Sequence, residues 1–472
     1  MEVLPESSPP RRDEESLVRF LEYCQSRAIE RGRPQFASIS LRVKHISPLA
    51  VLQSISEPSS VHFYMERPAE GEAIAGAEEA WREEFAGQSR FAEAQSAIED
   101  VTRNTICIGD LDHRLAGPRF FFYYTFADEP ESGSSFPPGT VFLPRWQVVG
   151  SAGDYFAVAN LSVAHDAPVK TLAQKVFAAH SKFQGFDYPE PAQKESQPVS
   201  VISSVELGER SFEERVSSAL DRIQAGEFKK LVISRALDFT TSGTADPLCW
   251  LNRLREKYRE CYSFSVSNGG GESFVGLTPE ILITTNGDQL QTEALAGSAP
   301  RGKTAGEDAR FASELLSSNK DLHEHALVAD SIVRRLIELG VDAEMDARPG
   351  LRVLPNVQHL LTGIRGKINT KSSFWKLLET LHPTPAVGGT PVAGVLSAIN
   401  ELEDHPRGLY AGTLGWVGPT GDGHAVVAIR SALVCGSRVR IFAGAGIVNG
   451  SVPESEKLET DLKLQVLLEA LG

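Results

Sequence analysis

The sequence lacks the features that place a protein in a membrane or on nucleic acid. No apolar run approaches the roughly 18 residues that a membrane-spanning helix needs. Residues 1–20 contain no apolar stretch that could serve as a signal peptide, and they are too acidic for an organelle transit peptide. The formal net charge of −15 argues against nucleic acid and anionic membranes as partners. We therefore expect a cytoplasmic protein with no nucleic-acid or membrane partner.

Cysteine is also scarce. The chain has five cysteines, without a CxxC pair among them: Cys24, Cys107, Cys249, Cys261 and Cys435. An odd and scattered set is typical of buried free thiols in a reducing compartment. The eleven histidines have no metal-type spacing with these cysteines, so a zinc site is not expected.

The length of 472 residues indicates two or three domains, or one large domain with an elaborated partner. We expect residues 1–12, which are rich in Pro, Ser and charge, to be disordered. Because the stretch 188–200 contains three prolines and little apolar content, we place a linker at 188–204. The linker would separate an N-terminal α/β half, residues 13–187, from a second region, residues 205–472.

Hydrophobic periodicity predicts both helices and strands. Strand-like runs occur at 36–43, 120–126, 155–163, 425–434 and 439–448, among others. Helical patterns cover 14–31, 305–339, a final segment from about 454, and 212–226, which begins with a Ser211/Glu214 capping box. The mixture, with many hairpin-like strand pairs, predicts an α+β fold with large antiparallel β-sheets.

Two pairs of carboxylates have i, i+3 spacing in helical segments. Asp321 and Glu324 form one pair, and Glu456 and Glu459 form the other. Residues three apart project from one face of a helix, and Mg²⁺ prefers carboxylate oxygens. A solvated acidic helix face explains the same spacing, so the spacing alone does not decide between the two interpretations.

Two further residues stand out against apolar surroundings. Lys230 lies at the entrance to an apolar strand, where a partly buried lysine loses proton affinity and can act as a base. Glu280 lies in the apolar stretch FVGLTPEILI, where a carboxyl with a raised pKa can act as a general acid. A surface lysine on an edge strand and an exposed glutamate on an alternating strand are the competing interpretations.

The order of these motifs resembles that of one enzyme family. The matching segments lie within residues 228–460: FKKLVISR, FVGLTPEILI, EALAGSAPRG, KDLHEHALVAD, LHPTPAVGGTP, GLYAGTLGWVG, VAIRSALV and GAGIVNGSVPESEKLET. Together they resemble the chorismate-utilising enzymes, which include isochorismate synthases, salicylate synthases and the chorismate-binding components of anthranilate and aminodeoxychorismate synthases. The resemblance implies the fold of anthranilate synthase component I, in which large antiparallel sheets form a two-subdomain sandwich flanked by helices.

The resemblance also implies a base, an acid and a metal. Lys230 matches the lysine that activates water for attack at ring carbon 2 of chorismate, and Glu280 matches the acid that protonates the departing 4-hydroxyl. Glu324 and Glu459 match the principal Mg²⁺ ligands. The carboxylates that hold metal-bound waters match Asp321 and Glu456.

Other positions match contacts to the substrate. Arg430 and Lys463 match cations that bind substrate carboxylates. Gly297 and Ser298 match the loop that lines the substrate in the family. Gly446 resembles a residue whose backbone contacts the same substrate.

One position distinguishes the members of the family. Aminating and salicylate-forming members resemble this chain but carry a threonine where it has Ala386, in HPTPAVGG. The alanine resembles the isochorismate synthases, which use water and need no glutaminase subunit. An aminating synthase, a salicylate synthase and a chorismate-binding homologue without turnover remain the alternatives.

Overall fold

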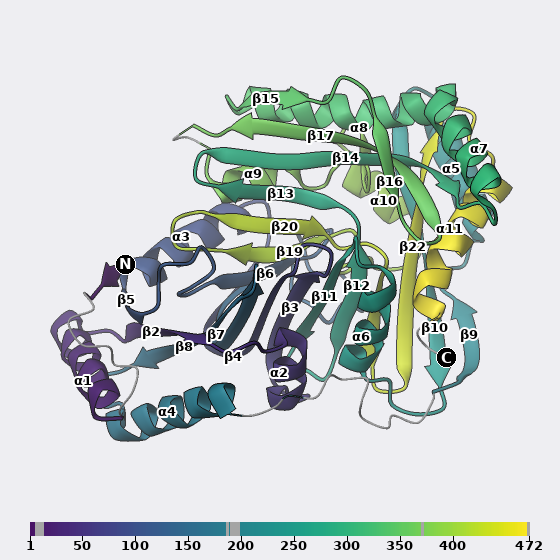
Figure 1. The fold of residues 1–472 in the computed structure, drawn as a ribbon. Helices are drawn as coiled ribbons and strands as arrows, with labels where there is room; N and C mark the ends of the chain where they lie inside the picture. The colour runs from purple at the N-terminus through teal and green to yellow at the C-terminus, as the bar shows by residue number, and fades with distance from the viewer. Residues whose placement is uncertain (5–13, 186–187, 189–198, 370–371, 470–472) are drawn as a thin grey trace.

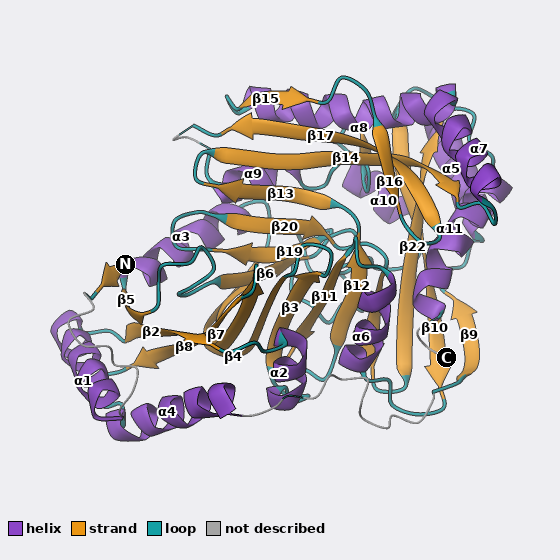
Figure 2. Cartoon of the chain, viewed as in Figure 1, coloured by secondary structure: helices purple, strands orange, loops and turns teal. Residues whose placement is uncertain are grey.

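The computed structural model describes residues 1–4, 14–185, 188, 199–369 and 372–469. These residues form one continuous β-sheet that branches, with helices packed around it (Figures 1 and 2). The branch point is β7 (Gly139–Ser151), which pairs with β4 (Glu72–Phe85), β6 (Phe120–Tyr124) and β8 (Asp154–Val163). Three arms of the sheet therefore branch from β7.

The first arm continues from β4 through antiparallel neighbours. Its strands are β3 (Val61–Arg67), β11 (Tyr262–Asn268), β12 (Ser273–Thr278), β21 (Ser431–Cys435), β22 (Arg438–Val448) and β10 (Lys230–Thr241). Two short strands end it, β9 (Val201–Glu206) and β18 (Gly389–Thr390), which both pair with β10.

The second arm continues from β6. Its strands are β19 (Thr413–Val417), β20 (Gly423–Val427), β13 (Ile281–Asn286), β14 (Gln289–Pro300) and β17 (Val357–Lys367), with β15 (Asp342–Met345) and β16 (Gly350–Val353) both along β17. In Figure 1 these strands cross the upper part of the molecule, while β10 and β22 run from top to bottom at the right. The far ends of the two arms thus approach each other.

The third arm is short and carries the parallel pairs. From β8 it passes to β2 (Gln35–Val43), β5 (Thr105–Gly109) and β1 (Glu2–Val3), and both contacts of β5 are parallel. The helices are α1 (Glu14–Arg31), α2 (Pro48–Ile55), α3 (Arg90–Arg103), α4 (Val169–Gly185), α5 (Phe212–Gln224), α6 (Pro247–Lys257), α7 (Ala305–Ser317), α8 (Asn319–Glu338), α9 (Phe374–Leu381), α10 (Val395–Leu402) and α11 (Pro453–Leu468). Within the described part of the chain, no helix is long and apolar enough to cross a membrane.

Aromatic side chains fill the core beside the branch point. All five residues of β6, FFFYY, are buried, because β19 and β7 pair with it on both edges and side chains cover both of its faces. Phe121 stacks on Phe63 of β3 with ring centroids 4.5 Å apart and meets Phe142 of β7 edge-on at 5.7 Å. A strand with such a continuous apolar run belongs at the centre of a sheet that is covered on both sides.

The predicted α+β fold with large antiparallel sheets is confirmed, as are several local details. The helix predicted at 14–31 has those bounds. The Ser211 Oγ accepts from the backbone N–H of Glu214 at 3.2 Å, and the Glu214 carboxylate accepts from that of Ser211 at 2.7 Å, which completes the predicted capping box. None of the five cysteines, all of which lie in the described residues, forms a disulfide, and four of them are buried.

The prediction of a single helix over 305–339 is wrong, because Ser318 interrupts the helix and separates α7 from α8. Ser318 has an extended backbone, with φ −70° and ψ 114°, and its Oγ accepts from the N–H of Asp321 at 3.3 Å. A serine at this place caps a new helix, α8, so the helical pattern continues after a change of direction. The strand-like run 425–434 also divides, into β20 and β21, at residues 428–430.

The two parts of the chain predicted from the sequence share the sheet. β3 pairs with β11 and β6 pairs with β19, so each of the two long arms crosses from residues before 187 to residues after 205. Residues 201–204 of the predicted linker lie in β9, and 189–198 lie outside the described residues. Of the predicted disordered terminus, Glu2 and Val3 lie in β1, held by pairing with β5, and 5–12 lie outside the described residues.

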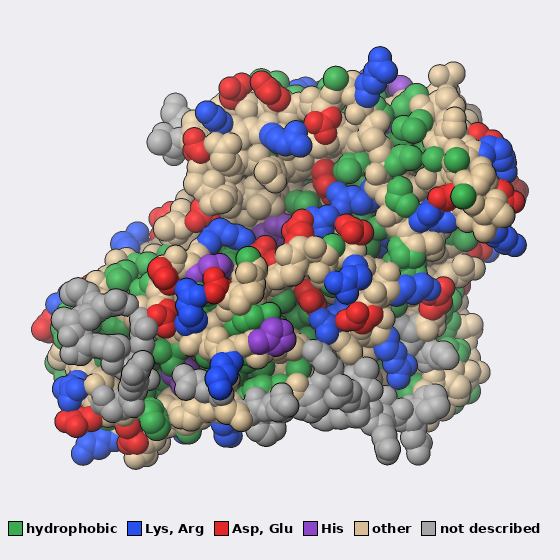
Figure 3. Space-filling model, in the orientation of Figure 1, with side chains coloured by type: hydrophobic (Ala, Val, Ile, Leu, Met, Phe, Trp, Pro, Cys, Tyr) green, Lys and Arg blue, Asp and Glu red, His purple; other side chains and the backbone are tan. Residues whose placement is uncertain are grey.

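On the face in Figure 3 basic and acidic side chains are interspersed.

Candidate active site

A cavity lies where the ends of the two long arms approach each other. Strands β10 and β22 form one side, β14 and β17 the other, and α8 and α11 each contribute a carboxylate. Ten of the predicted site residues line it: Lys230, Glu280, Gly297, Ser298, Glu324, Ala386, Arg430, Gly446, Glu459 and Lys463. Apolar side chains fill the spaces between them: Val232, Leu295, Val387, Ile429 and Phe442. The remaining two predicted residues, Asp321 and Glu456, lie on the same helices outside the cavity lining.

Lys230 begins β10 with its side chain 1% exposed, whereas its neighbour Lys229 is exposed. Successive residues of a strand point to opposite faces, so only one of the two lysines can enter the cavity. The Lys230 Nζ donates to Oε1 of Glu324 at 2.8 Å. The ion pair compensates the burial of both charges and joins the first arm to α8.

Gly446 makes room for this ion pair. It lies opposite Val232 in the β10–β22 pairing, next to the lysine. A Cβ at this position would lie 2.4 Å from Oε1 of Glu324 and 2.9 Å from Cε of Lys230. The close approach of two side chains to the backbone of β22 therefore requires glycine here.

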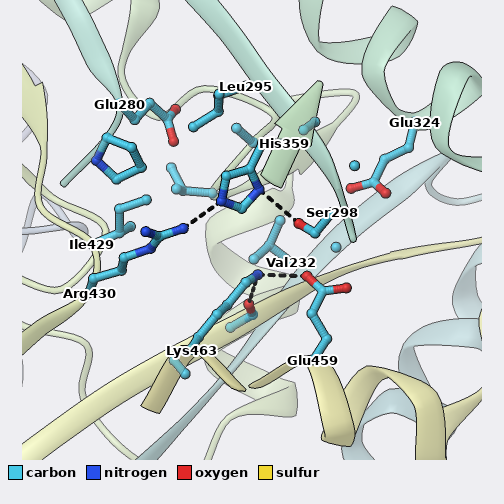
Figure 4. A pocket seen from close by; sticks show the side chains of 18 of the residues that line it. Val232, Glu280, Leu295, Ser298, Glu324, His359, Ile429, Arg430, Glu459 and Lys463 are labelled. Carbon is cyan, nitrogen blue, oxygen red and sulfur yellow. Dashed lines mark hydrogen bonds and ion pairs between the residues drawn. The ribbon is translucent and has the colours of Figure 1, made fainter. Parts of the chain in front are cut away.

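The four predicted metal-binding carboxylates come from α8 and α11 and gather with three lysines. Besides the Lys230–Glu324 pair, Lys463 Nζ lies 2.7 Å from Oε1 of Glu459, as seen in Figure 4. On the outer side Lys320 Nζ lies 2.9 Å from Oε1 of the buried Glu456. No three metal-binding side chains of the described residues are gathered at coordinating positions.

The electrostatics of these carboxylates fit a divalent cation. Burial raises the pKa of Asp321, and the nearby charges of Glu324 and Glu459 raise it further. Burial and Glu459 likewise raise the pKa of Glu456, against the effect of Lys320. Carboxylates that repel one another in a partly buried place need compensating positive charge, which the lysines provide here. A hard cation with oxygen ligands would provide it equally well.

Glu280 lies between β12 and β13, in the short segment that connects the first arm to the second, and it lines the same cavity as Lys230 of β10. Its side chain is 4% exposed, and the Thr384 Oγ1 donates to its Oε1 at 3.4 Å. Burial, reinforced by the charge of Glu293, raises the pKa of Glu280 to about 8, although Lys230 lowers it. A carboxyl with this pKa is protonated at neutral pH and can donate a proton.

His359 is a cavity residue that the sequence analysis missed. It lies on β17 in register with Ser298, and Figure 4 shows its ring between Ser298 and Arg430. Arg430 Nη2 donates to Nε2 of the ring, so Nδ1 carries the proton and donates to the Ser298 Oγ at 2.9 Å. Burial, with the charge of Arg430, holds the pKa of His359 well below its usual range, so the ring is neutral. The one available signal was a histidine within the apolar strand pattern VQHLL.

Two backbone irregularities position this chain of hydrogen bonds. Gly297 has φ +78°, and the β14–β17 register shifts between Ala296 and Ser298, as in a β-bulge. The bulge brings Ser298 opposite His359. Arg430 has φ +49°, a conformation that costs a non-glycine residue about 1–3 kcal/mol and that the surrounding fold must impose.

The guanidinium of Arg430 keeps a donor for a ligand. The side chain is buried, and its Nη1 has no partner among the described protein groups. A buried donor without a partner costs free energy unless a bound acceptor satisfies it. Since the residue lines the cavity, the acceptor that fits best is a carboxylate of a bound molecule.

A buried base candidate, a protonated acid across the cavity and cations for bound carboxylates define an enzyme that acts on a small organic anion. Residues 20–472 match the family described as "Chorismate binding enzyme". The chain belongs to this family, as its sequence resemblance predicted.

Relatives with known names cover nearly the whole chain. Over 399 residues, 84% of this chain and 82% of the relative, it is 33% identical to the isochorismate synthase MenF of Bacillus subtilis (strain 168). Over 448 residues, 95% and 92% of the two chains, it is 31% identical to the salicylate biosynthesis isochorismate synthase of Pseudomonas aeruginosa. The fold matches MenF, the menaquinone-specific isochorismate synthase from Escherichia coli, with a TM-score of 0.75, 23% identity and coverage of 96% of this chain and 100% of that one.

Proposed function

We propose that the protein is an isochorismate synthase, which adds water at ring carbon 2 of chorismate and expels the hydroxyl from carbon 4. The observation that carries the proposal is that Lys230, at the start of β10, and Glu280, in the connection between β12 and β13, line one cavity. A base and an acid that act on different ring carbons must be separate groups on separate supports. The names of the relatives support the same reaction.

The substrate would be held by its two carboxylates. Arg430 offers the unpartnered Nη1, and Lys463, whose Nζ also donates to the Gly444 carbonyl at 2.8 Å, offers an ammonium on the other side of the cavity. Gly297 and Ser298 would line the ring, and Gly446 would contribute a backbone contact. Apolar walls limit the access of bulk water, which strengthens every charge interaction with the substrate.

The cofactor would be Mg²⁺, with Glu324 and Glu459 as direct ligands and Asp321 and Glu456 on bound waters. When bound, the cation would neutralise a substrate carboxylate and polarise the conjugated ring system as a Lewis acid. The protein groups supply the proton transfers. Lys230 acts as the neutral amine, released from its ion pair with Glu324. It takes a proton from water as the new C2–O bond forms, the ring double bonds shift, and Glu280 gives its proton to the hydroxyl as the C4–O bond breaks.

Ala386 is the proposed determinant of the nucleophile. It lines the cavity in a turn whose Val387 and Gly388 N–H groups donate to the Thr384 carbonyl at 3.1 and 2.9 Å. Its methyl group adds no hydrogen-bonding partner beside the ring, where aminating and salicylate-forming relatives would place a hydroxyl. We therefore propose that water is the nucleophile, without a glutaminase partner, and that the cytoplasmic product feeds menaquinone or siderophore and salicylate synthesis.

Product analysis tests the proposal. Purified protein is incubated with chorismate and Mg²⁺, in buffer with or without ammonium, and the products are separated by chromatography. Isochorismate should form under both conditions, with the Lys230→Ala variant as the inactive control and Lys229→Ala as the active one. An aminated product, stoichiometric pyruvate or no conversion would each refute the assignment.

A further inference from the structure

Glu293 is a buried carboxylate that the proposed reaction does not use. It lies on β14, is 8% exposed, and does not line the cavity. Its Oε2 pairs with Nη2 of Arg352 on β16 at 2.7 Å. Its Oε1 accepts from the backbone N–H of Ile281 at 3.2 Å.

The bond to Ile281 places Glu293 directly behind the general acid. Ile281 follows Glu280 in the chain and begins β13. The ladder between β13 and β14 pairs Thr284 with Gln291 and runs from there toward the hairpin, so it does not reach Ile281. The Glu293 side chain therefore accepts a hydrogen bond from a backbone N–H that the pairing between β13 and β14 does not use. On the other side, the Thr278 Oγ1 accepts from the N–H of Glu280 at 3.2 Å.

We propose that Glu293 is a positioning residue for Glu280, because it fixes the backbone that aims the acid into the cavity and sets a buried negative charge behind it. This inference rests on the proposed function, in which Glu280 is the general acid. Arg352 holds the Glu293 carboxylate in place. The consequence for the reaction is that Glu280 keeps its proton at the pH at which it must donate it.

The charges around both carboxylates agree with this role. Burial and the Glu293 charge together raise the pKa of Glu280, while Lys230, the Thr384 hydrogen bond and Lys463 lower it. Besides Lys230 and Lys463, the charged or titratable groups that act on or respond to the two carboxylates are Arg352, Arg67, Glu70, Tyr262, Arg430 and Tyr410. A like charge near a buried acid disfavours its ionised form.

The pH dependence of kcat tests the proposal through the Glu293→Gln variant. Glutamine keeps the size of the side chain and an oxygen for the Ile281 N–H, but it removes the charge. Since Glu280 must be protonated to act, activity falls as the pH rises through its pKa. We expect this alkaline limb to move about one pH unit lower, so that kcat above the limb falls about tenfold and kcat below it changes little.

Two further variants separate positioning from a general structural role. Glu344→Gln removes the same charge from an exposed site on β15 and should leave the limb in place. Glu293→Asp keeps the charge, so the alkaline limb of its pH profile should lie close to that of the unmodified protein. An equal loss of kcat at every pH, or a lower melting temperature with an unmoved limb, would refute the proposal. If the unmodified protein makes no isochorismate, the proposed function has failed instead, which the same product assay reports.

Discussion

A single methyl group at position 446 should slow turnover about a hundredfold without unfolding the protein. In the Gly446→Ala variant the new Cβ would lie 2.4 Å from the Glu324 carboxylate oxygen and 2.9 Å from Cε of Lys230, whereas ordinary contacts begin near 3.4 Å. The carboxylate must therefore retreat by about 1 Å, and the lysine must also move. Displacements of this size in a catalytic arrangement cost about a hundredfold in rate.

The fold should survive, because the atoms in the way are the ends of two flexible side chains. We expect a destabilisation of about 1–3 kcal/mol, as for other overpacked sites. The measurements are kcat for isochorismate formation, the affinity for Mg²⁺ by calorimetry, and the melting temperature. Gly306→Ala is the matched control, since nothing lies within 4 Å of its added Cβ. A Gly446→Ala enzyme with unchanged kcat and metal affinity would show that the tight packing against β22 has no catalytic role.

The remaining predictions concern single side chains. Lys230→Ala should lower kcat by about a hundredfold or more while Lys229→Ala keeps it, and the reverse result would mean that the cavity-facing lysine is misassigned. Glu459→Gln should abolish Mg²⁺-dependent turnover in a folded protein, and full wild-type activity in excess chelator would contradict the metal role. The pKa of Glu280 in the folded protein, about 8, lies above its ordinary value of 4.5, so the stability of the fold falls as the pH rises from 4.5 to 8. Glu280→Gln removes this loss, so the variant should lose turnover yet melt at a higher temperature than wild type at pH 9. Ala386→Thr should slow isochorismate formation and release some pyruvate, whereas simple crowding would lower the melting temperature without new products.

Local sequence rules predicted the elements that carry the site. The family resemblance singled out Lys230, and strand alternation explains why its neighbour Lys229 is exposed. The i, i+3 spacing predicted that both carboxylates of each pair share a helix face, but only Glu324 and Glu459 line the cavity. The capping box at Ser211 depends on residues three apart, so it too was readable from the sequence. In each case the determining interaction lies within one turn or one strand.

Features that depend on distant parts of the chain could not be predicted. The position of His359 in the cavity depends on the bulge at Gly297, which sets the register between β14 and β17. The left-handed backbone of Arg430 is imposed by its neighbours, since nothing local favours it. The interruption at Ser318 has a local signal, because a serine three residues before an aspartate can cap a helix, but the helical pattern continues on both sides of it.

The branched sheet has a consequence for how the molecule can be divided. A cut near residues 189–198 would leave β3 and β6 unpaired on one edge in the first fragment and β11 and β19 unpaired in the second. Bare edges of this kind are templates for aggregation. The fragments should therefore be insoluble when made alone and should regain activity only when produced together.

The same pairings join strands about 200–290 positions apart, so the ribosome must release most of the chain before either arm can close, and folding should be slow.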